Sequence, residues 1–178
     1  MNQRRDIMKE YLKLNILNVE IQREDEKQLH VPPLLYGAYN NALNGTLIYS
    51  EEGLTIHFKE ENLKVGYEEL DYVELSFIFK RTSYRGLPEN ACYIDVYLKC
   101  KDQRSYELCT LSHKEVVDLY EVLKNKDITI HDLMKVIKTL EKFENIEDGF
   151  YSFIRTHGKE VANKYGLMYP KIDNTRTK

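Results

Sequence analysis

The sequence predicts an α+β protein, in which a bent antiparallel sheet of six or seven strands is closed by a helix and further helices lie at both ends of the chain. From about residue 34 to 111, short runs of alternating apolar and polar residues are separated by polar turns, a pattern typical of antiparallel strands. After residue 111, apolar residues recur every three or four positions, which indicates helices. We expect an N-terminal helical extension (1–33), a sheet domain with its closing helix (34–126), a helical hairpin (127–170) and a flexible tail (171–178).

The N-terminal stretch has two readings. A helical stripe is formed by Ile7, Tyr11, Leu14, Leu17 and Ile21, whereas strand-like alternation is formed by Leu12, Leu14 and Ile16. We predict a helix over about 4–22 and keep the strand as the alternative. Pro32 and Pro33 then prevent any helix from running on into the sheet domain.

Six strands are expected in the sheet domain, over residues 45–50, 53–58, 62–67, 71–80, 92–100 and 105–111. Residues 34–38 would be the first of seven. Gly53 lies in the polar turn between two of these strands, where a positive φ costs a glycine little. The segment RTSYRGLPENA (81–91) contains Gly86 and Pro88, and we predict that it is a loop.

The helix that follows the sheet is well marked at its start. Ser112 is a good N-cap residue, and Glu115 three positions later completes a capping box. Leu111 can contact Val116 as a hydrophobic staple. We therefore predict a helix over 113–124.

Two more helices are expected beyond it. Thr129 and Asp132 form a second cap signature, and apolar spacing predicts a helix from there to about Phe143. A last helix is predicted over roughly 148–165, with Gly166 as its C-terminal stop.

Few folds have this order of elements, in which short antiparallel strands are followed directly by one capped helix. Together with the segments LIYSEEGLTIHF, LKVGYEEL and DYVELSF, it resembles the pleckstrin-homology (PH) superfold in its bacterial form, over about residues 45–124. The resemblance implies a nearly closed sheet plugged at one end by the helix. The resemblance rests on the order of the elements and on their hydrophobic pattern, and it includes no invariant motif. Another α+β protein with a meander capped by helices is therefore the competing interpretation.

Charge is unevenly distributed. The whole chain has 26 Lys and Arg against 29 Asp and Glu, a net charge of −3, which argues against a nucleic-acid-binding protein. Residues 51–74 have 8 acids and 2 bases (net −6), whereas residues 80–104 have 6 bases and 3 acids (net +3) and residues 150–178 have 6 bases and 2 acids (net +4). The basic C-terminal segment could therefore dock on its own domain or promote self-association.

Lipid-binding members of the PH superfold usually carry Lys and Arg in the first hairpin, where this chain has Glu51 and Glu52. The family's lipid role therefore does not transfer to those positions, because the local charge would repel anionic headgroups. An alternative anion site is the basic loop with Lys80, Arg81 and Arg85. Candidates for a protein contact are the acidic residues Glu51, Glu52, Glu68 and Glu69 and the outward tyrosines Tyr72, Tyr93 and Tyr97.

The sequence contains no recognisable catalytic or metal-binding pattern. The five histidines show neither a metal-ligand spacing nor a nearby nucleophile, and we expect surface roles for them. No Gly-rich loop precedes a helix. The cysteines, expected to be buried reduced thiols, are Cys92, Cys100 and Cys109. We therefore expect no metal, no cofactor and no enzymatic activity.

The function that this pattern favours is a non-enzymatic cytoplasmic binding module that acts through protein–protein contact. The cytoplasmic location is expected because the sequence contains neither a secretory signal nor an apolar stretch of membrane-spanning length. Two alternatives stay open, an anion- or lipid-headgroup-binding PH-like module and an immunity- or anti-defence-type inhibitor. The expected partner is an unidentified protein or a second copy of the chain, with no nucleic acid and at most peripheral membrane contact.

Overall fold

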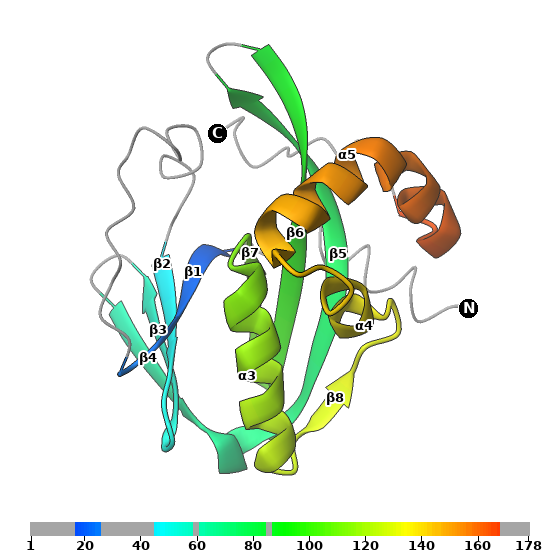
Figure 1. The fold of residues 1–178 in the computed structure, drawn as a ribbon. Helices are drawn as coiled ribbons and strands as arrows, with labels where there is room; N and C mark the ends of the chain where they lie inside the picture. The colour runs from blue at the N-terminus through cyan, green and yellow to red at the C-terminus, as the bar shows by residue number, and fades with distance from the viewer. Residues whose placement is uncertain (1–16, 26–44, 59–60, 85–86, 168–178) are drawn as a thin grey trace.

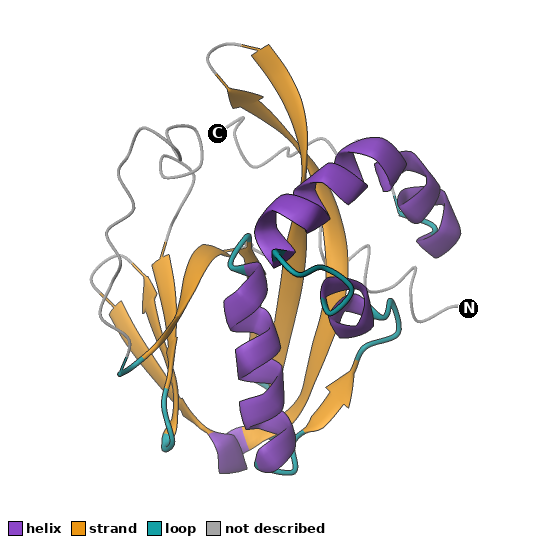
Figure 2. Cartoon of the chain, in the orientation of Figure 1, coloured by secondary structure: helices purple, strands orange, loops and turns teal. Residues whose placement is uncertain are grey.

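The computed structural model of the chain describes residues 17–25, 45–58, 61–84 and 87–167, and the side chains of residues 80–91 are not described. It shows an α+β fold in which one mixed sheet curves around a central helix (Figures 1 and 2). The eight strands of this sheet are β1 (Leu17–Arg23), β2 (Gly45–Tyr49), β3 (Gly53–Phe58), β4 (Glu61–Gly66), β5 (Leu70–Tyr84), β6 (Leu87–Cys100), β7 (Ser105–Thr110) and β8 (Thr129–His131). The described helices are the 3₁₀ turn η1 (Tyr67–Glu69), α3 (His113–Asn125), α4 (Val136–Leu140) and α5 (Ile146–Tyr165).

The strand predictions between residues 45 and 111 are confirmed to within one or two residues at most of their ends. Hairpin pairing is antiparallel along β2–β3–β4 and along β5–β6–β7. Alternation buries one side of each strand, as Leu54 and Ile56 show on β3, because a strand presents successive side chains to opposite faces.

The sheet as a whole is mixed, so the expectation of an antiparallel sheet is wrong. Its strand order is β4-β3-β2-β1-β7-β6-β5-β8, and β1 pairs in parallel with both β2 and β7. Residues 17–23 are therefore a strand, not part of the helix that we predicted over 4–22. The buried residues Val19 and Ile21 belong to the core through this strand. The rest of the expected helix, and the possible strand at 34–38, lie outside the described residues.

The predicted loop at 81–91 is also wrong. Backbone pairing continues from Lys80↔Ala91 to Tyr84↔Leu87, so β5 and β6 form one long hairpin. Its outer part, residues 80–84 and 87–91, extends beyond the strands that flank it and is called here the β5–β6 arm (Figure 1). Pro88 is tolerated there because β7 pairs only with Ile94–Lys99, so the proline nitrogen is not needed for a ladder bond to β7.

Helix α3 is confirmed, but its predicted cap is not. The Ser112 hydroxyl makes no cap hydrogen bond; it accepts one from the backbone N–H of Ile21 at 3.1 Å. This bond joins the start of α3 to β1. Leu17 and Asn18 are the two residues of β1 that pair with β7, and Ile21 lies beyond them. The Ser112 hydroxyl gives the Ile21 amide an acceptor there.

The helical hairpin is shorter than predicted. Residues 129–131 form β8, which pairs in parallel with Tyr72–Glu74 of β5. The predicted cap of Thr129 with Asp132 is therefore wrong. The N-cap residue of α4 is Lys135, and the Asp132 carboxylate accepts from the amides of Val136 and Ile137 at 2.6 and 3.2 Å. Helix α5 and its stop are confirmed, since Gly166 has a φ of 66°.

The main core lies between the sheet and helices α3, α4 and α5. Its fully buried aromatic residues are Tyr49, Phe77, Phe79 and Phe150. A small second cluster lies on the opposite, outer face of the sheet and is formed by Ile78, Tyr93 and Cys109. Within the described ranges, no helix combines the length and apolar character needed to cross a membrane.

We predict that Ser112→Ala lowers the free energy of unfolding by about 1–2 kcal/mol, because the Ile21 amide loses its hydroxyl acceptor in a partly buried position. Urea unfolding monitored by circular dichroism measures this loss. Ser152→Ala, at an exposed position of α5, is the control and should change stability little. Equal effects of the two substitutions would contradict a bridging role for the Ser112 hydroxyl.

Candidate functional site at the charged end of the sheet

Four segments that are distant in sequence meet at one end of the fold. They are the β2–β3 turn, η1, the β6–β7 turn and the C-terminal end of α3, which lie together at the bottom of Figure 1. We call this region the charged end and define it by Glu51, Glu52, Glu68, Glu69, Lys101, Asp102, Arg104 and Lys126.

Arg104 organises one side of the charged end. Its guanidinium donates to the carboxylates of Glu69 and Asp102 and, at 3.4 Å, to the Tyr106 hydroxyl. Glu69 also accepts from the Gly66 backbone N–H at 3.0 Å. The Gly66 amide and then Arg104 hold the pKa of Glu69 below its ordinary value. The backbone and then the side chain of Arg104 do the same for Asp102.

Lys126 organises the other side. Its ammonium lies 3.2 Å from the Glu51 carboxylate and 5.6 Å from the centre of the Tyr67 ring. The Tyr67 hydroxyl donates to the Ser50 carbonyl at 2.6 Å. Burial and then the charge of Glu51 raise the pKa of Tyr67 to about 12. The end of α3 is thereby tied to the β2–β3 turn and η1.

The third base, Lys101, is held through the backbone. Its side chain donates to the Glu68 carbonyl at 2.8 Å, and its amide donates to the Glu69 carbonyl at 2.9 Å. The predicted acidic surface is thus interleaved with bases that the sequence interpretation had treated separately. That interpretation had no means of bringing residues 68–69 and 101–104 together, because the contact arises from the β5–β6–β7 register.

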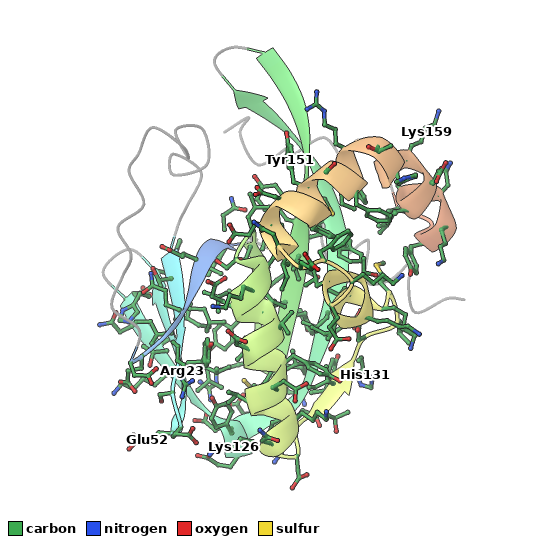
Figure 3. The ribbon with its side chains drawn as sticks, in the orientation of Figure 1. Arg23, Glu52, Lys126, His131, Tyr151 and Lys159 are labelled. Atoms are coloured by element: carbon green, nitrogen blue, oxygen red, sulfur yellow. The ribbon has the colours of Figure 1, made fainter. Side chains whose placement is uncertain are left out.

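Two of the four predicted acids stay available. Glu51 and Glu69 form ion pairs, whereas Glu52 and Glu68 are exposed and form no salt bridge with any residue that the structure describes. Figure 3 shows Glu52 and Lys126 at the same end of the molecule. Glu52 and Glu68 are therefore unneutralised carboxylates of the charged end, beside a set of bases held by internal contacts.

The basic candidates lie elsewhere. Lys80 and Arg81 are on the β5–β6 arm and not on a loop, and Arg85 lies outside the described residues. The β5–β6 register places the arm and the charged end at opposite ends of the hairpin, since Leu70 pairs with Cys100 and Tyr84 pairs with Leu87. Lys80 and Arg81 are therefore separated from Lys101 and Arg104 by the length of this hairpin.

The tyrosine candidates lie on the outer face of the sheet, but only two of them reach its surface. Tyr72 and Tyr97 are half-buried with ring centres 6.2 Å apart, and Tyr72 also contacts the exposed His131 edge-on at 5.1 Å. Tyr93 is buried in the second cluster, so it cannot serve as an outward contact residue. Its burial depends on Ile78 and Cys109 of the neighbouring strands, which alternation within one strand does not reveal.

Sequence interpretation also missed two buried acids on this outer face. Asp95 and Glu107 are 1% and 5% exposed, and Asp95 accepts from the Ser76 hydroxyl at 2.8 Å. Strand alternation places Asp95 on the face of β6 opposite its apolar residues. Whether Asp95 and Glu107 are buried on that face depends on their neighbours in the fold, which alternation does not reveal.

Among the described residues, one histidine and all three cysteines are buried. His113 is buried, so the expectation of a surface role is wrong for this residue, and burial lowers its pKa to about 4. The three cysteines are buried free thiols, as expected, and burial raises the pKa of Cys92 and Cys100. No group of three or more potential metal ligands occurs within the described ranges.

Comparison with protein-family models, with curated proteins and with solved structures finds no match to this chain.

We predict that Arg104→Gln raises the pKa of Glu69 and of Asp102, because the guanidinium favours the charged form of both carboxylates. Glu69 should not return fully to its ordinary value, since the Gly66 amide still donates to it. Carboxyl-detected NMR titration measures both shifts. Arg23→Gln, which removes an exposed pair with Asp25 on β1, is the control and should leave both values unchanged.

Proposed function

We propose that the protein is a non-enzymatic cytoplasmic binding module and that its charged end receives a basic segment of a partner protein. The observation that carries this proposal is the pair of exposed carboxylates, Glu52 and Glu68, contributed by two different turns of one surface. A basic segment that reached both would gain two ion pairs without displacing Lys126 or Arg104 from their own partners.

The contacts around these carboxylates favour a preformed surface. Tyr67, Lys101 and Arg104 bond the turns of the charged end to one another. Exposed ion pairs of this kind contribute little to folding stability. Charge complementarity across an interface, by contrast, raises the rate of association and selects the partner. A partner that binds here would therefore associate rapidly and in a salt-dependent manner.

The PH-like arrangement is part of the same proposal. It is supported by the run of strands β4-β3-β2-β1-β7-β6-β5, which leaves β4 and β5 joined through η1 and not paired with each other, and by the position of α3 directly after β7. The parallel pairing of β1 departs from an all-antiparallel sheet. The proposal therefore takes the PH-like element order without the family's lipid-binding role.

One observation favours a second function, binding of an anionic surface. The β5–β6 arm extends away from the body of the fold (Figure 1), and Lys80 and Arg81 belong to it. A projecting arm can reach a membrane that the sheet itself would not contact. Anionic lipid headgroups attract Lys and Arg by about 1 kcal/mol per residue near the surface.

We predict that the double reversal Glu52→Lys and Glu68→Lys abolishes capture of the partner in pull-downs from extracts of cells that produce the protein. Binding of the wild type should weaken as salt is raised from 0.05 to about 0.5 M, because a higher ionic strength screens exposed charges. Affinity purification followed by mass spectrometry measures both effects. A single tight partner would favour the inhibitor hypothesis among protein-binding functions.

The matched control is the double reversal Glu141→Lys and Glu144→Lys, which makes the same change of charge at exposed positions around the α4–α5 connection. It should leave capture intact. Loss of the same partner in both double variants would show that net charge, and not the charged end, determines binding.

For the alternative function, we predict that the wild-type protein does not sediment with liposomes that contain a quarter phosphatidylserine, because Lys80 and Arg81 together would contribute only about 2 kcal/mol at an anionic surface. Cosedimentation that is lost in the variant Lys80→Gln, Arg81→Gln would instead establish the arm as a lipid contact. Neutral liposomes are the control for apolar binding.

A further inference from the structure

His113 is buried at the junction of α3, α5 and the sheet. It is the first residue of α3 and is 6% exposed, in line with the buried residues Val116, Leu119 and Leu123 of that helix. Its position belongs to the apolar stripe of α3, although its side chain carries two polar ring nitrogens. An aliphatic or aromatic residue would satisfy the packing at this place without that polarity.

The ring of His113 makes an aromatic contact with α5. The Phe150 ring of α5 meets it edge-on, with centres 4.6 Å apart. Phe150 in turn stacks on Phe77 of β5 at 5.7 Å and meets Phe143 at 6.1 Å. His113 therefore contacts the side chain through which α5 is anchored to the sheet.

Neither ring nitrogen has a hydrogen-bond partner among the residues that the structure describes, although both are buried. A neutral imidazole in this position leaves one donor and one acceptor unsatisfied, and a protonated one would bury a full charge. The N-terminal end of a helix dipole adds a further penalty to a positive charge. The junction is therefore compatible only with the neutral ring.

The charges of the described residues do not compensate a protonated ring. Burial is the sole cause of the lowered pKa, so none of the described charged groups acts on it appreciably. The charged residues that flank these contacts in sequence are Glu20 on β1, Lys114 and Glu115 on α3, and Glu147 and Asp148 on α5. Glu20, Lys114, Glu147 and Asp148 are exposed, where solvent screens them.

We propose that His113 is an acid-sensitive contact that holds α5 in place: when its ring takes up a proton, α5 leaves α3 and the sheet and exposes Phe150, Ile154 and Phe77. The helix is the element that gives way because it forms no ladder bonds with the sheet and contains Gly158, which weakens a helix interior. The strands around His113 are held by backbone pairing on both sides. The charged end lies at the other end of α3 and takes no part.

The direction and size of the effect follow from linkage. The pKa of His113 is about 4 in the docked state and 6.5 for an unperturbed histidine, so the undocked state binds more protons between these values. Undocking is therefore favoured as the pH falls and disfavoured as it rises. Relative to pH 8, the undocked population should increase about tenfold at pH 5.5 and on the order of 50- to 100-fold at pH 4.5.

Hydrogen exchange measured by mass spectrometry tests this, with protection factors corrected for the intrinsic pH dependence of exchange. In the wild type, protection of α5 should fall about tenfold between pH 8 and 5.5 while β6 and β7 keep theirs. In His113→Phe, the protection of α5 should be independent of pH over this range. His113→Gln, which cannot be protonated either, serves if the larger ring disturbs folding.

His157→Gln is the matched control, since it removes the histidine that lies on α5 itself, which is half-exposed and paired with Glu160. It should retain the full pH response. The proposal is overturned if His113→Phe and His113→Gln respond to pH as the wild type does. It is equally overturned if β6 and β7 lose protection together with α5, because the transition would then be global unfolding.

Discussion

The backbone hydrogen bonds of β1 hold the two halves of the sheet together. Leu17 and Asn18 pair with β7, and Val19 to Arg23 pair with β2, so a seven-residue strand serves two ladders in succession. Without it, the sheet would divide into β2–β4 and β5–β8, joined along the chain only by η1. The Ser112 hydroxyl extends this junction to α3, because it bonds the Ile21 amide. Both the core and the orientation of α3 depend on this strand.

The junction at β1 also determines where the charged end forms. Once β1 joins the two halves, α3 lies between them with its C-terminal end near the β2–β3 turn (Figure 2). Lys126, at the end of α3, then forms an ion pair with Glu51 in the β2–β3 turn. Arg104, in the β6–β7 turn, forms one with Glu69 of η1. The ion pairs follow from the fold and do not create it, since exposed pairs of this kind contribute little to stability.

The sequence predicted what depends on neighbours along the chain. Hairpins such as β2–β3, helix α3 and the Gly166 stop are encoded by alternation, helical spacing and turn residues within a few positions. It could not predict β1, because its pairing partners are residues 45–49 and 108–109, far away in the chain. The extension of β5 and β6 through Pro88 was missed for a related reason: whether a proline ends a strand depends on which edge is unpaired.

The same distinction applies to the site. The sequence identified Glu51, Glu52, Glu68 and Glu69 as one acidic region. Only the fold shows that two of them, Glu51 and Glu69, form ion pairs with Lys126 and Arg104. His113 was placed at a helix start, where its neighbours in sequence are polar, and the aromatic ring that buries it comes from Phe150, 37 positions along the chain. Burial of this kind is a property of tertiary packing.

The charged end and the His113 junction are located at opposite ends of α3, a helix of 13 residues that spans about 20 Å. The two regions respond to different conditions. Salt screens exposed carboxylates such as Glu52 but has little access to a buried ring. Mild acid protonates an undocked His113, whereas Glu69 and Asp102 have lowered pKa values and stay charged. The binding proposed at the charged end and the release proposed for α5 can therefore be tested under different conditions, salt for the first and mild acid for the second.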